Sequence, residues 1–301
     1  MRRRECLKGF VALAALGMIP AAEAEIEAVR PQGRVRDLRG GIWLSERALM
    51  ARLFEARGVI VGERHDNPEH HRLERWLIDR LASRGQLGGV AMEMLDPSQQ
   101  ARLESYSAAE LLALPEADLR KLLQWNEGWN WQAYGPIVRR VLELGLVPRA
   151  ANIGRQAIKE LVATNQAPAL PPAVAAVHRR ILIEGHCHLL PENRLDGMLA
   201  AQVARDKAMA AALAALPPVA VLICGSGHAR RDIGVALHSD VAPLSLACVE
   251  LAPGQNDWRS ALPAGVDGVP PYDLAWFTLP VERGDPCEAL RERVAHDQRS
   301  M

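Results

Sequence analysis

A repeated alternation of short apolar runs with helical patterns constrains the fold most strongly. Residues 219–224 read Val-Ala-Val-Leu-Ile-Cys, and shorter apolar runs occur at 59–61 and 90–92. Segments with apolar residues at helical spacing lie between these runs. Strands that are apolar throughout and separated by helices are typical of a parallel sheet covered on both faces. We therefore expect an α/β protein with a mostly parallel central sheet flanked by helices.

Two long stretches with helical patterns, about 95–135 and 153–216, interrupt this alternation. We expect them to form a helical layer or subdomain over the carboxyl ends of the strands. Residues 280–301 are expected to be a solvated tail. Further strands are expected at 146–151, 244–251 and 274–278.

The first 24 residues have the organisation of an export signal. Four basic residues lie among the first eight, an apolar run fills 9–19, and Ala22-Glu23-Ala24 resembles a cleavage site. Arg3-Arg4 with Lys8 resembles the twin-arginine signature, although an ordinary Arg-rich secretory signal has the same outline. The apolar run is too short for a membrane anchor, which needs about 20 residues. Both kinds of signal predict a soluble, exported protein of the bacterial periplasm.

The charge balance is close to neutral, with 36 Lys and Arg against 36 Asp and Glu. Removing the signal leaves 32 basic and 34 acidic residues, a net charge of −2. This balance gives no electrostatic reason to bind nucleic acid or an anionic membrane. Four cysteines remain, and they lack the spacing of a zinc site. Disulfides among them are compatible with export, but the sequence does not specify their pairing.

Polar residues follow the expected strands at the points where ligands of open α/β sheets bind. We therefore expect a ligand site there, in which His65, Glu93 and His228 could hold a divalent metal. Glu93 could instead be structural and pair with Arg64 or Arg149, since a buried carboxylate needs a partner. The residues that follow the strands are Gly62-Glu63-Arg64-His65, Glu93, Asn152 and Gly225-Ser226-Gly227-His228.

Two expected helices carry polar residues that need an explanation. His70 shares a face with apolar residues and is expected to point inward, whereas His71 falls on the polar side and is expected in solvent. Asp206 interrupts the apolar stripe of a helix expected over about 194–216. A buried aspartate is costly unless it is bonded, so we expect Asp206 to hold either the loop 184–192 or a strand-end histidine.

Two G-x-x-H motifs occur in chain order, at 62–65 and 225–228, with Glu93 between them. The ordered set of motifs resembles the ChaN-like haem-binding uptake proteins of the Tiki superfamily and implies one such domain over 25–279. The other motifs of the set are G-E-x-H-D-N-P at 62–68 followed by two histidines, A-M-E-M at 91–94, W-x-x-Y-x-P at 131–136, Asn152, Gly185-His186-Cys187, A-Q-x-x-R-D at 201–206 with Met209-Ala210, and G-x-G-H-A at 225–229.

The resemblance implies an exported protein of iron and haem uptake that binds haem, an iron protoporphyrin, between the α/β core and the helical layer. Tyr134 lies in the matched W-x-x-Y-x-P motif and is expected to bind the haem iron in preference to Tyr106 and Tyr272. A homodimer and contacts with haem-uptake machinery of the cell envelope are also implied. Relatives best known as haem binders are lipoproteins, and no lipid-acceptor cysteine follows the signal here, which argues against a membrane-docked role. The other residues expected to contact haem are Arg64, His65, His70, His186 and His228.

An enzyme is the competing class, because the Tiki superfamily also includes metal-dependent proteases and erythromycin-esterase-like hydrolases. In such an enzyme His65 and His228 would hold a metal or act as a base, and Glu63 or Glu93 would polarise water. No serine or cysteine nucleophile motif is present, and superfamily membership alone does not transfer chemistry. We therefore expect a binding protein and leave catalysis open.

Overall fold

The computed structural model describes residues 31–288 and 290–292, so the expected export signal at 1–24 and the last residues of the expected tail, 293–301, lie outside it. The strands are β1 (Arg34–Asp37), β2 (Ile42–Leu44), β3 (Gly58–Glu63), β4 (Gly89–Met92), β5 (Arg149–Ala150), β6 (Ala220–Gly225), β7 (Leu244–Glu250) and β8 (Leu274–Thr278). The α-helices are α2 (Glu46–Glu55), α3 (Pro68–Ser83), α4 (Pro97–Leu103), α5 (Ala108–Ala113), α6 (Glu116–Leu123), α7 (Trp131–Glu143), α8 (Arg155–Thr164), α9 (Pro172–Gly185), α10 (Glu192–Ala214) and α11 (Ser226–Ala229). Short 3-10 helices are η1 (Val235–His238), η2 (Trp258–Ala261) and η3 (Val266–Gly268).

The strands of the described residues form one eight-stranded sheet in the order β2-β1-β8-β7-β3-β6-β4-β5. The six strands from β8 to β5 in this order are parallel, and β1 and β2 add an antiparallel edge. The expected α/β fold with a mostly parallel sheet is thereby confirmed. The two edge strands were not expected, because runs of three or four residues are too short to show a clear periodicity.

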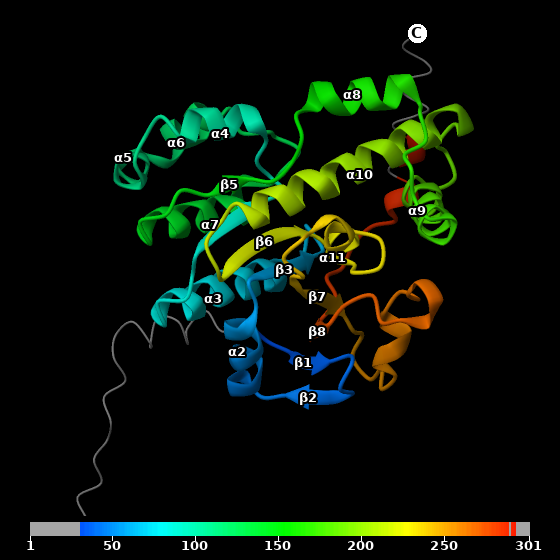
Figure 1. The fold of residues 1–301 in the computed structure, drawn as a ribbon, viewed down its shortest axis with the longest axis horizontal. Coiled ribbons are helices and arrows are strands. Elements are labelled where there is room, and N and C mark those ends of the chain that lie inside the picture. The colour runs from blue at the N-terminus through cyan, green and yellow to red at the C-terminus, as the bar shows by residue number, and fades with distance from the viewer. Residues whose placement is uncertain (1–30, 289, 293–301) are drawn as a thin grey trace, which may run out of the picture.

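Helices cover both faces of the sheet. Val59 and Val61 of β3 pack with Leu73 on the side of α2, α3 and α7, whereas Ile60 packs with Met209 on the side of α10. Figure 1 shows α10 lying along the sheet above β6 and β3. Burial on both faces explains why the central strands are apolar at every position rather than at alternate ones.

Capping residues mark the starts of helices α2 and α3. The hydroxyl of Ser45 accepts a hydrogen bond from the backbone N–H of Ala48 at the start of α2. The side-chain oxygen of Asn67 accepts a hydrogen bond from the backbone N–H of Glu69 at the start of α3. Pro68 occupies the first turn of this helix, where a missing backbone N–H has no cost. The start of α3 matters for the site, because it brings two histidines next to the end of β3.

The two helical stretches expected at about 95–135 and 153–216 fold as separate groups of helices. The first contains α4, α5, α6 and the start of α7, and the second contains α8, α9 and α10. In Figure 1 the group α4–α6 and the pair α8 and α9 lie on opposite sides of the molecule, with α10 reaching from one side to the other. In the described part of the chain no helix has the length and apolar character needed to cross a membrane.

The first glycine of the first G-x-x-H motif is required by close packing. A Cβ added at Gly62 would lie 2.4 Å from the Cβ of Ala229 and 3.0 Å from the Cα of Ser226, whereas nothing lies within 4 Å of a Cβ added at Gly227. We expect Gly62→Ala to lower the free energy of unfolding by about 2 kcal/mol, the usual effect of overpacking a core. Urea unfolding measures the change. Gly227→Ala is the matched control, and an equal loss in both variants would contradict the packing argument.

Candidate functional site

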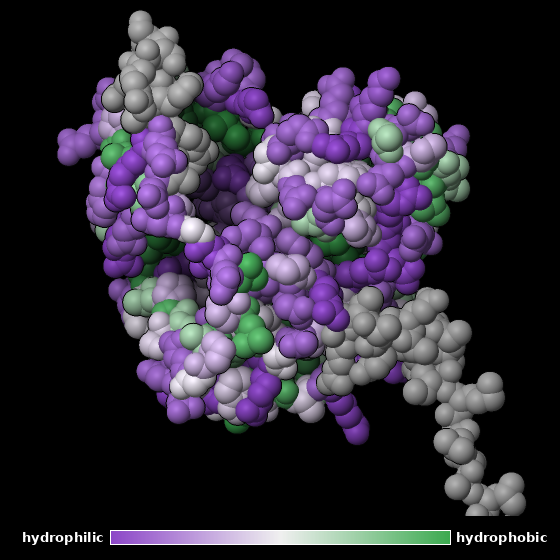
Figure 2. Space-filling view, turned by 180° about the vertical axis from the view of Figure 1, so that it is seen from behind, coloured by the Kyte–Doolittle hydropathy of each residue, from purple (hydrophilic) through white to green (hydrophobic). Residues whose placement is uncertain are grey.

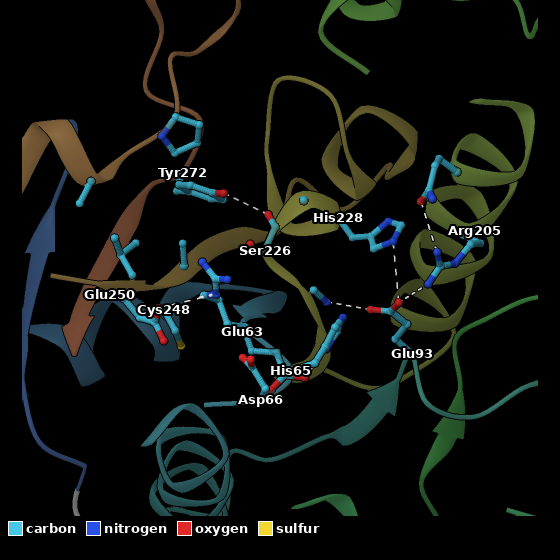
Figure 3. A pocket seen from close by; sticks show the side chains of 18 of the residues that line it. Glu63, His65, Asp66, Glu93, Arg205, Ser226, His228, Cys248, Glu250 and Tyr272 are labelled. Atoms are coloured by element: carbon cyan, nitrogen blue, oxygen red, sulfur yellow. Dashed lines mark hydrogen bonds and ion pairs between the residues drawn. The ribbon is translucent and has the colours of Figure 1, made fainter. Parts of the chain in front are cut away.

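A cavity of about 900 Å³ lies at the carboxyl ends of β3, β4, β6 and β7. Figure 3 shows His65, Glu93, Arg205 and His228 gathered on one side of it and Glu250 and Tyr272 on the other. From behind, the molecule shows a deep hollow with largely hydrophilic walls (Figure 2). The strand ends that were expected to converge therefore do so. The lining residues are Glu63, Arg64, His65, Asp66, Glu93, Trp129, Gln202, Arg205, Gly225, Ser226, Gly227, His228, Ala247, Cys248, Val249, Glu250, Ala261, Pro263 and Tyr272.

Glu63, the last residue of β3, is a buried carboxylate with several donors around it. Its Oε1 accepts a hydrogen bond from the hydroxyl of Tyr134 at 2.6 Å and lies 2.9 Å from Nδ1 of His65. Its Oε2 lies 3.0 Å from Nε2 of His71. Burial alone would raise the pKa of Glu63, but the contacts with both histidines outweigh it and lower the pKa to about 2. His71 was expected in solvent, and that prediction is wrong.

Glu74 of α3 lies next to Glu63 and behaves in the opposite way. It is completely buried, and burial together with the negative charge of Glu63 raises its pKa well above the ordinary value. Two adjacent buried carboxylates cannot both ionise easily, so one holds a proton. Glu74 is therefore the protonated member of the pair and Glu63 the charged one.

Asp206 of α10 is the buried partner of the second motif histidine. Its Oδ1 lies 2.7 Å from Nδ1 of His228, and only 1% of the aspartate is exposed. This contact confirms one of the two roles expected for the aspartate that interrupts an apolar helix face. The other ring nitrogen of His228, Nε2, lies 3.8 Å from Oε1 of Glu93.

Glu93 follows β4 and is neutralised by α10. Arg205 forms an ion pair with its Oε1, and the backbone N–H of Gly225 donates to its Oε2 at 2.7 Å. Burial would raise the pKa of Glu93, but the charges of His228, Arg205 and His65 outweigh it and lower the pKa. The expected partners Arg64 and Arg149 are therefore wrong, and Arg205, 112 residues away in sequence, takes their place.

The cavity brings together part of the expected haem-contacting set. His65 and His228 line it, and so does Arg64, whose side chain is 53% exposed and lies 3.7 Å from Glu250. Burial would lower the pKa of His65, but its bond to Glu63 and the charge of Glu93 raise the pKa. The cavity therefore joins two imidazoles with one half-exposed arginine, which is paired with Glu250.

Three other expected residues lie outside the lining of this cavity. His70 is fully buried, with Nδ1 accepting from the backbone N–H of Arg64 and Nε2 2.9 Å from the hydroxyl of Thr278. Nδ1 of His186 bonds the carbonyl of Leu182 at the end of α9. Tyr134 is 1% exposed, and burial and the charge of Glu63 raise the pKa of its hydroxyl far above the ordinary value.

The divalent metal expected from the sequence has no support in the arrangement of these residues. The carboxylate of Glu93 is bonded by Arg205 and Gly225, which leaves it poorly suited to share a metal with His65 and His228. Within the described residues, no three His, Cys, Asp or Glu side chains are grouped so that they could hold a metal ion.

The C-terminal segment is fastened to the rim of the cavity. Arg283 donates hydrogen bonds to Glu250 at 2.6 and 2.7 Å and to Asp66 at 2.7 Å, and both acids line the cavity. Four residues later, Cys287 forms a disulfide with Cys187 in the turn after α9. This pairing could not be predicted from the sequence, because the two cysteines are 100 residues apart.

Comparisons with known proteins agree with this fold. A family model described as haem-binding uptake, Tiki superfamily, ChaN matches residues 49–238. One similar solved structure is described as cofacial haem binding to ChaN of Campylobacter jejuni. Its sequence is 21% identical to this one, the match covers 82% of this chain and 98% of that chain, and the TM-score is 0.68. A search among curated proteins finds no match.

Two further solved structures are more distant. The type III effector HopBA1 is 13% identical and covers 78% of this chain and 93% of its own, with a TM-score of 0.42. A mutant of an erythromycin esterase in its open conformation is 14% identical and covers 80% of this chain and 81% of its own, also with a TM-score of 0.42. Nothing about function follows from similarities of this size.

The fold and the cavity define an α/β protein with a large cavity at the carboxyl ends of its parallel strands, which is where ligands of such sheets bind. Because the family model matches more than half of its length, the chain belongs to the haem-binding uptake family ChaN of the Tiki superfamily.

The buried His70 should make folding stability depend on pH. Burial lowers its pKa in the folded state to about 4, whereas the unfolded chain has an ordinary histidine pKa of about 6.5. The unfolded state therefore takes up the proton first, and the stability present above pH 6.5 is lost as the pH falls toward 4. We expect the contribution of His70 to shrink by about 2 kcal/mol between pH 7.5 and 5.

Urea unfolding of the wild type and of His70→Asn at both pH values measures this contribution as the difference between the two proteins. A difference that stays constant from pH 7.5 to 5 would mean that His70 accepts a proton as readily in the folded state as in the unfolded one.

Proposed function

We propose that this protein binds haem in the cavity at the strand ends and acts, after export to the periplasm, in haem uptake. The observation that carries the proposal is a pair of imidazoles fixed by buried carboxylates. Nδ1 of His65 bonds Glu63 and Nδ1 of His228 bonds Asp206. Such a bond selects the tautomer and leaves Nε2 as the nitrogen offered to a ligand, and imidazole nitrogen is a common axial ligand of haem iron.

His65 is the better placed of the two to bind the iron. Its side chain is 40% exposed, whereas that of His228 is 11% exposed and close to Glu93. The edge of the His65 ring contacts Trp129, with ring centroids 4.9 Å apart, and this contact holds its orientation. His228 is then available to donate or accept a hydrogen bond on the same side of the cavity.

The rest of the cavity also fits haem. Its volume of about 900 Å³ is in the range of small-molecule and cofactor sites. Trp129, Tyr272 and Val249 supply apolar surface, and the exposed guanidinium of Arg64 can pair with a propionate. When bound, haem would supply an iron centre, which His65 would hold while Arg64 would pair with a propionate.

The interpretation of Tyr134 as the iron ligand fits this geometry less well. A tyrosine binds ferric iron as a phenolate, but burial and Glu63 hold the Tyr134 hydroxyl in its neutral form. That hydroxyl already donates to Glu63, and the bond would have to break before iron could bind. We assign Tyr134 to the positioning of Glu63, and through it of His65.

Two features support export. The sequence at 1–24 has the organisation of a signal. The Cys187–Cys287 disulfide is of a kind that persists in oxidising compartments such as the bacterial periplasm.

A hydrolytic role would use the same groups, since an imidazole fixed by a carboxylate is also how a general base is arranged. The paired motif histidines are the observation that favours it. If the protein were such an enzyme, His65→Ala would abolish turnover of an ester or peptide substrate. This loss of turnover would be measurable in the absence of haem.

Hemin binding should depend on His65. Titration of the purified protein with hemin, followed by absorbance, is expected to show a saturable change near one haem per chain. We expect His65→Ala to weaken binding by at least about tenfold, a loss of about 1.4 kcal/mol, because the iron loses its protein ligand.

The exposed His188 provides a matched control, and His188→Ala should bind hemin like the wild type. A wild type that shows no saturable change would overturn the proposed function. Equal affinity in His65→Ala would overturn only the choice of ligand.

Replacing Tyr134 by phenylalanine distinguishes the two candidate ligands. We expect the ferric complex of Tyr134→Phe to keep the charge-transfer bands of the wild type, because the hydroxyl bonds Glu63 rather than iron. Absorbance and resonance Raman spectra of the two complexes make the comparison. Loss of a phenolate-to-iron band in the variant would return the ligand role to Tyr134.

A further inference from the structure

Arginine and tryptophan side chains form a stacked ladder at the antiparallel edge of the sheet. Arg34 and Arg36 lie on β1 and Trp43 lies on β2. The guanidinium groups of Arg34 and Arg36 are 4.3 and 5.1 Å from the ring centroid of Trp43. Arg36 is also 4.4 Å from the ring of Trp258 in η2, and Arg259 is 4.5 Å from the same ring. The ladder thus alternates three cations with two indoles and joins the sheet edge to the loop after β7.

The ladder is held rigidly from below. Phe277 of β8 is almost fully buried, and the rings of Trp43 and Trp258 contact it edge-on at 5.7 and 6.0 Å between centroids. Both indoles therefore keep fixed positions whether or not a partner is present.

The positive charge of the ladder is not neutralised within the described residues. Arg34, Arg36 and Arg259 form no ion pair with a carboxylate there, whereas Arg39 in the turn after β1 and Arg52 of α2 pair with Asp273 and Asp37. Arg36 donates one hydrogen bond to the backbone carbonyl of Gly41, and its Nε is a buried donor without a partner. Three guanidinium groups without a carboxylate partner, gathered on one surface, favour an anionic partner.

A hollow of about 520 Å³ lies beside the ladder. Arg34, Trp43 and Trp258 border it, and no Asp or Glu is among the described residues of its wall. An exposed aliphatic side chain belongs to this surface, since Leu279 lines the hollow and is 54% exposed. Its wall consists of Gln32, Gly33, Arg34, Trp43, Leu251, Ala252, Pro253, Gly254, Gln255, Asn256, Trp258, Phe277, Thr278 and Leu279.

We infer that this surface, the Arg-Trp ladder with its hollow, docks on a bilayer that contains anionic phospholipid, because a local cluster of cations can attract such a surface where the overall net charge and the absence of a lipid-acceptor cysteine give no such expectation. Guanidinium groups bond phosphate oxygens, and indoles prefer the level of the headgroups, where one edge is apolar and the other wet. The exposed Leu279 would enter the outermost part of the acyl layer. A soluble anion such as inorganic phosphate would use the cations but not the exposed indole and aliphatic side chains.

The docking surface adjoins the proposed haem cavity. The segment that carries Trp258 and Arg259 continues directly into Ala261 and Pro263, which line the cavity. Arg34 pairs with Phe277 in the register of β1 and β8, at the same end of the sheet as the cavity. Docking would therefore bring the cavity close to the membrane, although the inference itself does not depend on haem.

Cosedimentation of the haem-free protein with vesicles tests the inference separately from the proposed function. We expect binding to vesicles of phosphatidylcholine with phosphatidylglycerol, weakening as salt is added, and little binding to phosphatidylcholine alone. Replacing all three ladder arginines by glutamine should lower the partition coefficient by at least about tenfold. Trp43→Ala should lower it at unchanged charge.

The control removes the same charge from exposed arginines away from the ladder, in R57Q/R84Q/R180Q, and should bind like the wild type. R34Q/R259Q keeps the less exposed Arg36 and serves if the triple variant fails to fold. Equal loss of vesicle binding in the control and the ladder variant would overturn the inference. It would also be overturned if inorganic phosphate abolished vesicle binding while a chloride salt of equal ionic strength left it intact. Failure to bind either vesicle would also overturn it and would leave haem binding untouched.

Discussion

The cavity depends on keeping one carboxylate charged at the buried end of the central strand β3. An isolated carboxylate in such a place would cost several kcal/mol, because burial removes it from water. Glu63 avoids this cost through contacts with three side chains. His65 comes from the β3–α3 connection, His71 from α3 and Tyr134 from α7. The strand, the two helices and the loop are thus held in one arrangement by a single charge. The same contacts fix the ring of His65 at the edge of the cavity.

Ionised and neutral buried groups occupy different places at the strand ends. Glu74 and His70 lie outside the lining of the cavity, and burial favours the neutral form of each. For His70, burial outweighs the opposing charges of Glu63 and Glu250. Glu93 with Arg205 and Asp206 with His228 lie at its walls. The protein therefore confines its ionised groups to the surface that a ligand would meet, while the layer beneath stays uncharged apart from Glu63. Such a preorganised polar wall needs no rearrangement when a ligand arrives.

The sequence predicts the position of the site better than its internal contacts. Parallel strands separated by helices place their carboxyl ends together, so the convergence of His65, Glu93 and His228 could be predicted, and an aspartate on an apolar helix face had to find a partner. The pairing of Glu93 with Arg205 could not be predicted, because these residues are 112 positions apart and meet only through the way α10 crosses the sheet. His71 was misplaced because a helical pattern shows which face is polar but not that Glu63 lies opposite it.

The disulfide between Cys187 and Cys287 has a consequence for how the rim of the cavity is held. It closes a loop of 100 residues that contains α10, β6, β7 and β8, and its entropic effect on an unfolded chain is on the order of 4–5 kcal/mol. The rim residue Arg283 lies just inside this closed loop. Reduction of this one bond would leave Arg283, through its ion pairs with Asp66 and Glu250, as a remaining link between the C-terminal segment and the rim of the cavity. The rim is in this way linked to the redox state of the surroundings as well as to folding.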